Sequence, residues 1–296
     1  MRDKVTVKLQ GGLGNQLFQY SAGKYFAEKQ NFKLVLDLSL LGKNTINHGE
    51  YLFDMVHDNK VKTIRNGEIK YQFYRIIRKF YNNSSIFTYI SNLFGFFFCK
   101  EIGYVSSLER KVVRHIDGYF QTWKYFNSLS KEIRDLFFVE SEKENFKDLK
   151  NYISANRVLC IHVRQGDYKL VEKIYGLLSV EYYSKALGFA LNKSKFSHIF
   201  VFSDEISRAR EILNDLLLEH KVVWIGEDSE LTPPEILVLM SGCNGIILAN
   251  STFSYWAALL SSNETLVIAP SIWYKSMNEP HALVPQNWKR ISSFWT

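Results

Sequence analysis

The sequence contains few cysteines and no long apolar segment. It has three cysteines without a CxxC pair: Cys99, Cys160 and Cys243. This pattern excludes a disulfide scaffold and a zinc ribbon, and it indicates a reducing compartment. The stretch that comes nearest to a membrane span, 86–99, is interrupted by polar residues and a glycine. It is also shorter than the roughly 18 apolar residues that cross a bilayer, so we expect no membrane-spanning helix.

Signal-peptide and metal-site patterns are also missing. The first residues lead directly into a strand pattern, without the apolar core of a signal peptide. His162, His198 and His220 are isolated from one another, so they lack the spacing of metal ligands. We expect a cytoplasmic protein without a metal site, with peripheral contact at the inner face of the cytoplasmic membrane as an option.

The residues that are present give an ordinary globular composition with an uneven charge. Hydrophobic residues make up 46% and aromatic residues 15% of the 296 residues, which excludes a mainly disordered chain. Residues 1–150 carry 24 basic and 16 acidic residues, whereas 151–296 carry 13 and 14. Within 60–114, 11 basic and 3 acidic residues alternate with aromatic ones. This pattern indicates helices with solvated basic side chains, contact with an anionic membrane surface, or nucleic-acid binding, in that order. We expect no nucleic-acid partner.

The first half begins with a β-turn-α-β pattern. Strands are predicted at 5–10 and 33–38, and the apolar spacing between them predicts a helix. Residues 40–117 indicate a mostly helical, aromatic region with loops, and the charged segment 141–150 indicates a linker. We therefore predict an N-terminal α/β domain over 1–150.

The second half alternates apolar runs with helical patterns. The runs lie at 158–163, 198–202, 222–225, 245–249 and 266–269, and the helical patterns lie at 180–191, 206–220, 233–241 and 252–262. Continuous apolar runs of this length suit parallel strands that are covered on both faces. The sequence therefore predicts a doubly wound parallel sheet over 151–296, with ligands at the carboxyl ends of its strands.

A glycine-rich turn, GGLGNQLFQY at 11–20, follows the first predicted strand. Gly12 and Gly14 permit a tight turn and close approach of a ligand to the backbone, and Asn15 opens the next helix with its amide directed into the cleft. A dinucleotide-binding loop would need a glycine where Leu17 stands, and no Walker lysine follows. A purely structural turn is the alternative.

The segment HVRQGDY, 162–168, lies at the end of the predicted strand 158–163. His162 and Arg164 are two residues apart, so they point to the same side of an extended chain. Arg164 offers a planar cation to phosphate oxygens, and Asp167 orients this arginine or accepts a proton. The alternative is a structural pair between Arg164 and Asp167.

Two further strand ends carry polar segments, FSDE at 202–205 and ANSTFSYW at 249–256. Asp204 either recognises a base or sugar or caps the helix that begins near 206. Ser251 and Thr252 form an anion site with the first N–H groups of the next helix, or they are an ordinary helix cap. Together the segments favour a ligand that carries a diphosphate.

Five ordered motifs resemble the bacterial α-1,2-fucosyltransferases of glycosyltransferase family 11 over essentially the whole chain. They are GGLGNQLFQY at 11–20, GYFQTWKYF at 118–126, HVRQGDY at 162–168, FSDE at 202–205 and ANSTFSYWAALL at 249–260. The family pattern often has a second arginine where Gln165 stands and a tryptophan where Tyr255 stands. Neither departure affects Arg164 or the Ser251–Thr252 pair.

The resemblance implies a GT-B-type fold of two facing Rossmann-like domains. The acceptor domain would be 1–150, with a helical aromatic insertion, and 151–296 would bind GDP-β-L-fucose. It implies metal-independent transfer of L-fucose, with inversion and without a cofactor, to the 2-hydroxyl of a terminal galactose. The acceptor would be a lipid-linked glycan in the synthesis of a surface polysaccharide of the O-antigen type. A transferase with another GDP-sugar or linkage and a non-catalytic glycan- or nucleotide-binding protein are the alternatives.

The resemblance also suggests roles for individual residues. Arg164 and the helix start at 251–253 would stabilise the leaving diphosphate. Asn15 would hold the fucose or the diphosphate from the opposite domain, and Asp167 is the nominal general base. The other nucleotide-binding candidates are Gly12, Gly14, His162, Asp204, Ser251, Thr252 and Phe253.

Overall fold

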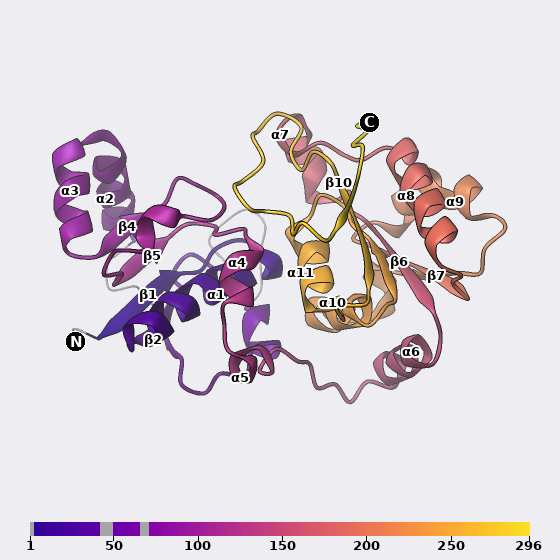
Figure 1. The fold of residues 1–296 in the computed structure, drawn as a ribbon, viewed down its shortest axis with the longest axis horizontal. Helices are drawn as coiled ribbons and strands as arrows, with labels where there is room; N and C mark the ends of the chain where they lie inside the picture. Colours follow the sequence, from indigo (N-terminus) through magenta and orange to yellow (C-terminus); the bar gives the residue numbers. More distant parts are fainter. Residues whose placement is uncertain (1–2, 42–49, 66–70) are drawn as a thin grey trace. The chain divides into compact units, whose positions relative to one another are not determined.

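The chain contains two β-sheets, each built of parallel strands (Figure 1). A computed structural model describes residues 3–41, 50–65 and 71–296, and for residues 71–75, 82, 167 and 170 it describes the backbone alone. The chain divides into two units, each with one sheet. Unit 1 comprises Met1–Phe138 and Pro280–Leu283, and unit 2 comprises Val139–Glu279 and Val284–Thr296.

The sheet of unit 1 has five strands, all of them parallel, in the order β3-β2-β1-β5-β4. Their bounds are β1 Lys4–Lys8, β2 Lys33–Asp37, β3 Lys62–Ile64, β4 Phe96–Phe98 and β5 His115–Asp117. The first two strands confirm the β-turn-α-β prediction. The last three lie in the region for which we predicted mainly helices and loops. That prediction was incomplete, because strands of three residues are too short to show an alternating pattern.

Helices flank this sheet. In chain order they are α1 Leu13–Gln30, the 3₁₀ turn η1 Tyr51–Asp54, α2 Tyr71–Asn83, α3 Ser85–Leu93, η2 Ser106–Leu108, α4 Trp123–Asn127 and α5 Lys131–Arg134. Helix α1 packs closely on β1, since a Cβ added to Gly23 would lie 2.2 Å from a methyl group of Val7. Helices α2 and α3 form a hairpin beside β4 (Figure 1). The helical prediction for this aromatic region is confirmed over 71–93.

The sheet of unit 2 has six strands, also all parallel, in the order β11-β10-β9-β6-β7-β8. Their bounds are β6 Val158–Val163, β7 His198–Ser203, β8 Val222–Ile225, β9 Gly245–Ile247, β10 Leu266–Pro270 and β11 Lys289–Ile291. The first five confirm the predicted strands and the doubly wound sheet. The strand β11 was not predicted, because this edge strand has three residues and two of them are basic.

The helices of unit 2 lie on both faces of this sheet. They are α6 Glu144–Ala155, η3 Asp167–Val171, α7 Glu172–Tyr175, α8 Val180–Lys193, α9 Ile206–Leu217, η4 Glu227–Ser229, α10 Pro233–Ser241 and α11 Thr252–Leu260. Four of them, α8 to α11, confirm predicted helices. In the part of the chain that the structure describes, no helix is long and apolar enough to cross a membrane.

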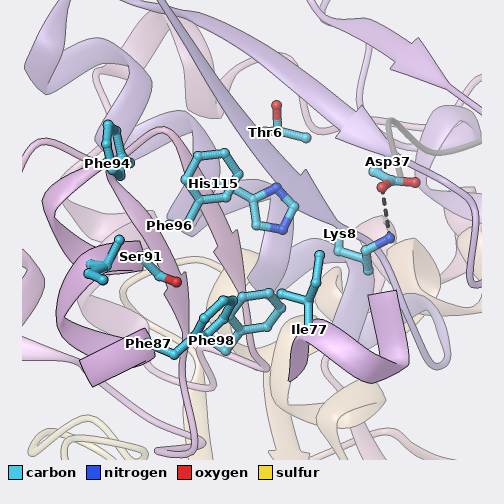
Figure 2. Close-up of a pocket in the computed structure, with 11 residues that line it drawn as sticks. Thr6, Lys8, Asp37, Ile77, Phe87, Ser91, Phe94, Phe96, Phe98 and His115 are labelled. Atoms are coloured by element: carbon cyan, nitrogen blue, oxygen red, sulfur yellow. Dashed lines mark hydrogen bonds and ion pairs between the residues drawn. The ribbon is translucent and has the colours of Figure 1, made fainter. Parts of the chain in front are cut away.

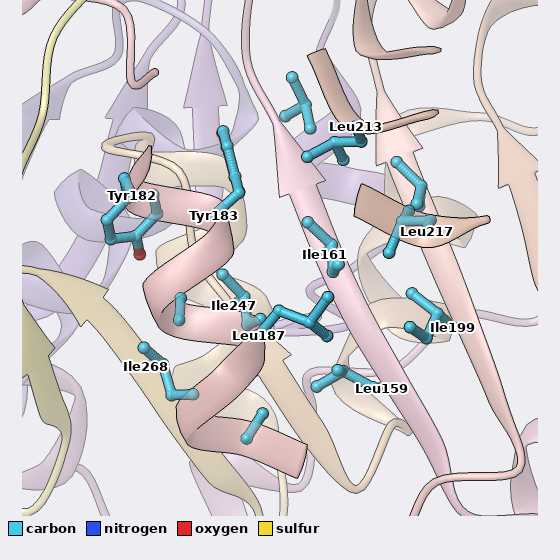
Figure 3. Packing of buried hydrophobic residues seen from close by; sticks show 14 of the residues in the cluster. Leu159, Ile161, Tyr182, Tyr183, Leu187, Ile199, Leu213, Leu217, Ile247 and Ile268 are labelled. Carbon is cyan, nitrogen blue, oxygen red and sulfur yellow. The ribbon is translucent and has the colours of Figure 1, made fainter. Parts of the chain in front are cut away.

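The central strand β6 explains why the core of unit 2 forms where it does. All six residues of β6 are buried. Leu159 and Ile161 point to one face, where α8 contributes Leu187 and α9 contributes Leu213 and Leu217 (Figure 3). Because side chains alternate along a strand, His162 points to the opposite face. There its ring lies 5.9 Å from that of Phe253, at the start of α11.

The boundary between the units lies earlier than the predicted boundary at residue 150. Residues 144–150, which the sequence analysis assigned to a linker, form the first part of α6. Phe146 and Ile153 of α6 are buried, and Lys143 forms an ion pair of 2.9 Å with Glu235 of α10. These contacts explain why the segment packs with unit 2.

Residues 280–283 also differ from the predicted division, because they pack with unit 1. The Thr122 hydroxyl donates to the Ala282 carbonyl at 2.7 Å, and the Tyr104 N–H donates to the His281 carbonyl at 3.2 Å.

Candidate functional site

Three of the sequence motifs meet at the carboxyl end of β6. The strand order of unit 2 changes direction here, since β7 follows β6 on one side and β9 adjoins it on the other. Open α/β sheets bind ligands at such a switch point. The motifs at 162–168 and 202–205 begin with the last two residues of β6 and β7, and the motif at 249–256 runs from the loop after β9 into α11.

Asp204 joins the loop after β7 to the loop after β6. Its carboxylate lies 3.1 Å from Nη1 of Arg164 and accepts a hydrogen bond of 3.0 Å from the backbone N–H of Gln165. A Cβ added to Gly166 would lie 2.5 Å from this carboxylate, so the glycine allows the two loops to approach. The guanidinium and the carboxylate are each about a quarter exposed, at 24%.

These contacts exclude one of the two alternatives for Asp204. The N-cap residue of α9 is Glu205, whose side chain makes no cap hydrogen bond, and the Ile206 N–H donates instead to the Glu227 carboxylate at 3.3 Å. The helix-cap interpretation of Asp204 is therefore wrong, because its carboxylate binds Arg164 and the Gln165 N–H instead. The side chain of Asp167 lies outside the described residues, so its pairing and its role as a base stay predictions.

Tyr168 joins the loop after β6 to the loop after β9. Its hydroxyl donates to the Asn250 carbonyl at 3.1 Å, and the Arg164 guanidinium lies over its ring, 5.4 Å from the centroid. The buried Asn250 side chain donates to the backbone carbonyl of Tyr175 at 2.8 Å. The sequence analysis gave no role to Tyr168 or Asn250, although both follow predicted strands. The signal in the sequence was an asparagine directly after an apolar run, a position from which its side chain can hydrogen-bond to the backbone of neighbouring loops.

The start of α11 faces this meeting point of loops. Ser251 is its N-cap residue, and its hydroxyl accepts a hydrogen bond of 3.3 Å from the Phe253 N–H. The cap interpretation is therefore confirmed for Ser251. Thr252 and Phe253 are half-buried, and the first turn contains no acidic residue. The positive end of the helix dipole can therefore act on an anion together with Arg164.

His162 is a buried, neutral side chain beneath this site. Burial, followed by the positive charge of Arg164, lowers the pKa of His162 from 6.5 to about 3. Its Nδ1 atom is buried and makes no hydrogen bond to any part of the chain that the structure describes. At physiological pH the imidazole therefore carries no charge, and it supports the start of α11 through its contact with Phe253.

Unit 1 brings two further motifs together at its own switch point, between β1 and β5. Gly11 has a φ of +78°, in the left-handed region, and a Cβ added there would lie 2.7 Å from the Asn15 amide nitrogen. Gly12 is the N-cap residue of α1, so the N-cap residue contributes no side-chain hydrogen bond to the start of this helix. Gly14 is buried in the first turn. The Asn15 amide oxygen accepts a hydrogen bond of 3.0 Å from the Gln121 side chain. Gln121 was quoted in a motif but had no predicted role.

Among the side chains that the structure describes, which do not include that of Asp167, no three His, Cys, Asp or Glu residues are grouped so that they could hold a metal ion. The described charged side chains that pair near the end of β6 are Arg164 with Asp204 and Lys169 with Glu205, and the second pair is an ion pair of 2.7 Å.

Comparison with known protein families identifies relatives over nearly the whole chain. The model of glycosyl transferase family 11 matches residues 1–292. An alpha-1,2-colitosyltransferase of Escherichia coli is 29% identical over 297 residues, which cover 97% of this chain and 98% of that protein. The O-antigen biosynthesis glycosyltransferase WbnK of Escherichia coli is also 29% identical, covering 92% of this chain and 95% of the relative. A galactoside alpha-(1,2)-fucosyltransferase 1 of Leontocebus fuscicollis is 26% identical, covering 61% of this chain and 54% of that protein.

A solved structure supports the fold. The fucosyltransferase NodZ from Bradyrhizobium superimposes with a TM-score of 0.52 at 14% sequence identity, covering 88% of this chain and 93% of NodZ. This likeness, with the two parallel sheets, confirms the predicted α/β fold of the GT-B type.

Proposed function

The chain belongs to glycosyl transferase family 11, and on this premise we propose that it transfers L-fucose from GDP-β-L-fucose to the 2-hydroxyl of a terminal galactose. The α-1,2 linkage is suggested by the names of the colitosyltransferase and the galactoside fucosyltransferase. The name of WbnK suggests an acceptor that belongs to an O-antigen-like surface polysaccharide, which we expect to be lipid-linked. The observation that carries the proposal is the convergence of Arg164 and the start of α11 at the end of β6.

A diphosphate leaving group fits this arrangement. In the transfer step, the acceptor hydroxyl oxygen forms a bond to the anomeric carbon on the side opposite to GDP, which inverts this carbon. The bond between the anomeric carbon and the phosphate oxygen breaks, and its electron pair stays on GDP. The guanidinium of Arg164, oriented by Asp204 and Tyr168, and the N–H groups of α11 would then stabilise the growing negative charge.

The other candidate residues have supporting roles in this proposal. Asn15, whose amide oxygen accepts a hydrogen bond from Gln121, would bind the donor sugar or its diphosphate. Asp167 would take the proton of the acceptor hydroxyl. His162 would support the nucleotide site as a neutral side chain, since its low pKa makes it a weak base near pH 7. Because a cation and a helix start would carry the diphosphate charge, we propose that transfer needs no metal ion.

Colitose is a second donor candidate, because a relative that covers nearly the whole chain is named as a colitosyltransferase. Colitose lacks the 3-hydroxyl group of fucose, so the two donors differ by one polar group. A site that hydrogen-bonds this hydroxyl would strongly reject the donor that lacks it.

A transfer assay with purified protein tests the donor, the linkage and the metal together. GDP-fucose, GDP-colitose, GDP-mannose and UDP-galactose are each offered with a panel of galactosides, with and without EDTA, and the product linkage is read by NMR. We expect α-1,2 transfer of fucose that is unchanged by EDTA. Transfer of colitose alone would replace the proposed donor. GDP binding without transfer from any donor would favour a non-catalytic binding protein, and loss of transfer in EDTA would refute metal independence.

The role of Arg164 is tested with a matched control at the other end of the same strand. Arg164→Ala should lower kcat by at least about two orders of magnitude, as expected for a lost cationic donor to the leaving group. Arg157→Ala, which changes an exposed arginine just before β6, should leave kcat near the wild-type value. A near-wild-type rate for the folded Arg164→Ala protein would remove this residue from the mechanism.

A further inference from the structure

Helix α3 of unit 1 presents an apolar stripe to solvent. Its sequence, SIFTYISNL, contains no charged residue, and none of its nine residues is buried. Ile86, Tyr89, Ile90 and Leu93 lie at the spacing of one helix face. Ile86 is 75% and Leu93 is 67% exposed. In a globular protein such a stripe normally packs against the core, so its exposure calls for another partner.

The inner side of α3 faces the sheet of unit 1 across a cavity. A cavity of about 260 Å³ separates the helix from the sheet, and Figure 2 shows Phe87 and Phe94 on the helical side with Phe96 and Phe98 of β4. Phe94 lines this cavity and is also 64% exposed. The cavity therefore opens next to the exposed stripe, and apolar side chains continue from one to the other.

Basic side chains accompany the stripe. Among the described side chains, Lys79 of α2 is exposed, as are Arg110 and Lys111 in the loop before β5. A Cβ added to Gly95 would lie 2.7 Å from the carbonyl oxygen of Val112. This basic loop therefore lies directly beside the end of α3.

We propose that the α2–α3 hairpin docks on the surface of an anionic lipid bilayer. The stripe of α3 enters the boundary between headgroups and acyl chains, and the basic side chains of α2 and the 110–112 loop contact the anionic headgroups. Apolar side chains next to lysine and arginine are the combination that binds helices at such an interface. The docking surface consists of Ile86, Tyr89, Ile90, Leu93, Phe94 and the bases Lys79, Arg110 and Lys111.

Charge and chemistry favour a bilayer over other partners. A symmetric contact with a second copy would bring the exposed Lys79, Arg110 and Lys111 of both copies to one interface, where like charges repel. A nucleic acid would attract the bases but would leave the apolar stripe exposed. An anionic bilayer satisfies both features, and its binding is independent of the residues of the proposed donor site.

Vesicle flotation of the full chain tests this proposal. The probes are vesicles of equal parts phosphatidylcholine and phosphatidylglycerol and vesicles of phosphatidylcholine alone, at physiological salt. We expect binding to the anionic vesicles only. Ile86→Asp/Leu93→Asp should reduce the bound fraction at least about tenfold, because the charges oppose insertion. The matched control is Leu218→Asp, which changes a 72% exposed leucine of unit 2 and should bind like the wild type.

A second pair of variants tests the charges without introducing a group that opposes insertion. Lys79→Gln/Lys111→Gln should weaken binding to anionic vesicles severalfold, whereas Lys193→Gln/Lys195→Gln in unit 2 should not. Absence of vesicle binding by the wild type, or unchanged binding of both hairpin variants, refutes the proposal. The proposal is also refuted if the wild type is an oligomer that Ile86→Asp/Leu93→Asp dissociates, or if the protein is retained on duplex DNA and does not bind vesicles.

Discussion

Glu235 offers a direct test of how α10 is held to the segment that precedes α6. Its carboxylate accepts hydrogen bonds from the Thr232 N–H at 2.6 Å and from Lys143 at 2.9 Å, and also from the Ser141 hydroxyl. With Thr232 it forms the capping box of α10. Burial alone would raise the pKa of Glu235, but the hydrogen bonds from Ser141, Thr232 and Lys143 outweigh it and lower the pKa from 4.5 to about 2.

The size of the effect follows from this difference in pKa. From 4.5 in the unfolded chain to about 2 in the folded one, the pKa falls by about 2.5, which corresponds to roughly 3 kcal/mol. The Lys143 side chain is 40% exposed, so solvent screens part of this interaction. We therefore expect Glu235→Gln to lower the free energy of unfolding of unit 2 by about 1–3 kcal/mol at pH 7.

The lowered pKa of Glu235 also determines how its contribution to the free energy of unfolding changes with pH. Because the folded pKa is the lower one, the stabilisation is complete above about pH 4.5 and is lost as the pH falls toward 2. Urea unfolding of the wild type and of Glu235→Gln, followed by tryptophan fluorescence between pH 7 and pH 3, measures the difference at each pH. It should shrink steadily below pH 5.

An exposed carboxylate in the same unit provides the control. Glu211 pairs with Arg208 three residues earlier on α9, and its side chain is 62% exposed. Glu211→Gln should change the free energy of unfolding by less than about 0.5 kcal/mol at every pH. A difference for Glu235→Gln that is equally small at pH 7, or that stays constant down to pH 3, would refute the reasoning.

Two further predictions concern buried groups. Lys8 and Asp37 form an ion pair of 2.8 Å in unit 1, with side chains 2% and 4% exposed. Lys8→Met should cost about 3–5 kcal/mol in urea unfolding, because it leaves the carboxylate buried without its cation, and Lys8→Met/Asp37→Leu should recover most of this loss. An equal loss in the double variant would contradict the ion-pair explanation. His162, whose burial lowers its pKa to about 3, should show no titration of its ring in NMR spectra between pH 5 and pH 9, and a midpoint near 6.5 would contradict its burial.

The sheet of unit 2 was predictable because its strands are long and buried on both faces. The six residues of β6 form one uninterrupted apolar run around a single histidine, and turn and helix signals bound the run. Unit 1 lacks this signal. Its β3 contains a lysine and a threonine, and β4 consists of three phenylalanines that also fit the aromatic helical region before them. Only their pairing with β2 and β5 makes these residues strands, and pairing between distant segments does not appear in local periodicity.

The division between the units was missed for a related reason. The segment 141–150 is charged and poor in apolar residues, which is typical of a linker. Its attachment depends on Glu235, about 90 residues later, which accepts hydrogen bonds from Ser141 and Lys143. A charged segment can form a linker or a helix that packs on the domain. Which of the two forms depends on whether a residue elsewhere in the chain, here Glu235, binds its polar side chains.

Strand register explains why the position of the site was predictable but its pairings were not. The motifs follow strands, so their place at one edge of the sheet follows from the parallel topology. The partner of Arg164 depends on which residues face one another in β6 and β7. Val163 pairs with Ser203, so the next residues along, Arg164 and Asp204, emerge side by side.

The register between β6 and β9 places Asn250 beside Arg164 in the same way. Ile161 pairs with Ile247 of β9, and three residues further along each chain lie Arg164 and Asn250. Arg164 therefore leaves the sheet between the loops that follow β7 and β9. Asp167, three residues away in sequence, is the partner that the spacing predicts, and its side chain lies outside the described residues. Asp204, 40 residues away, is a partner that only the register provides. A shift of β7 by one residue would remove this partner, so the hydrogen-bond ladder between β6 and β7 sets the orientation of the guanidinium.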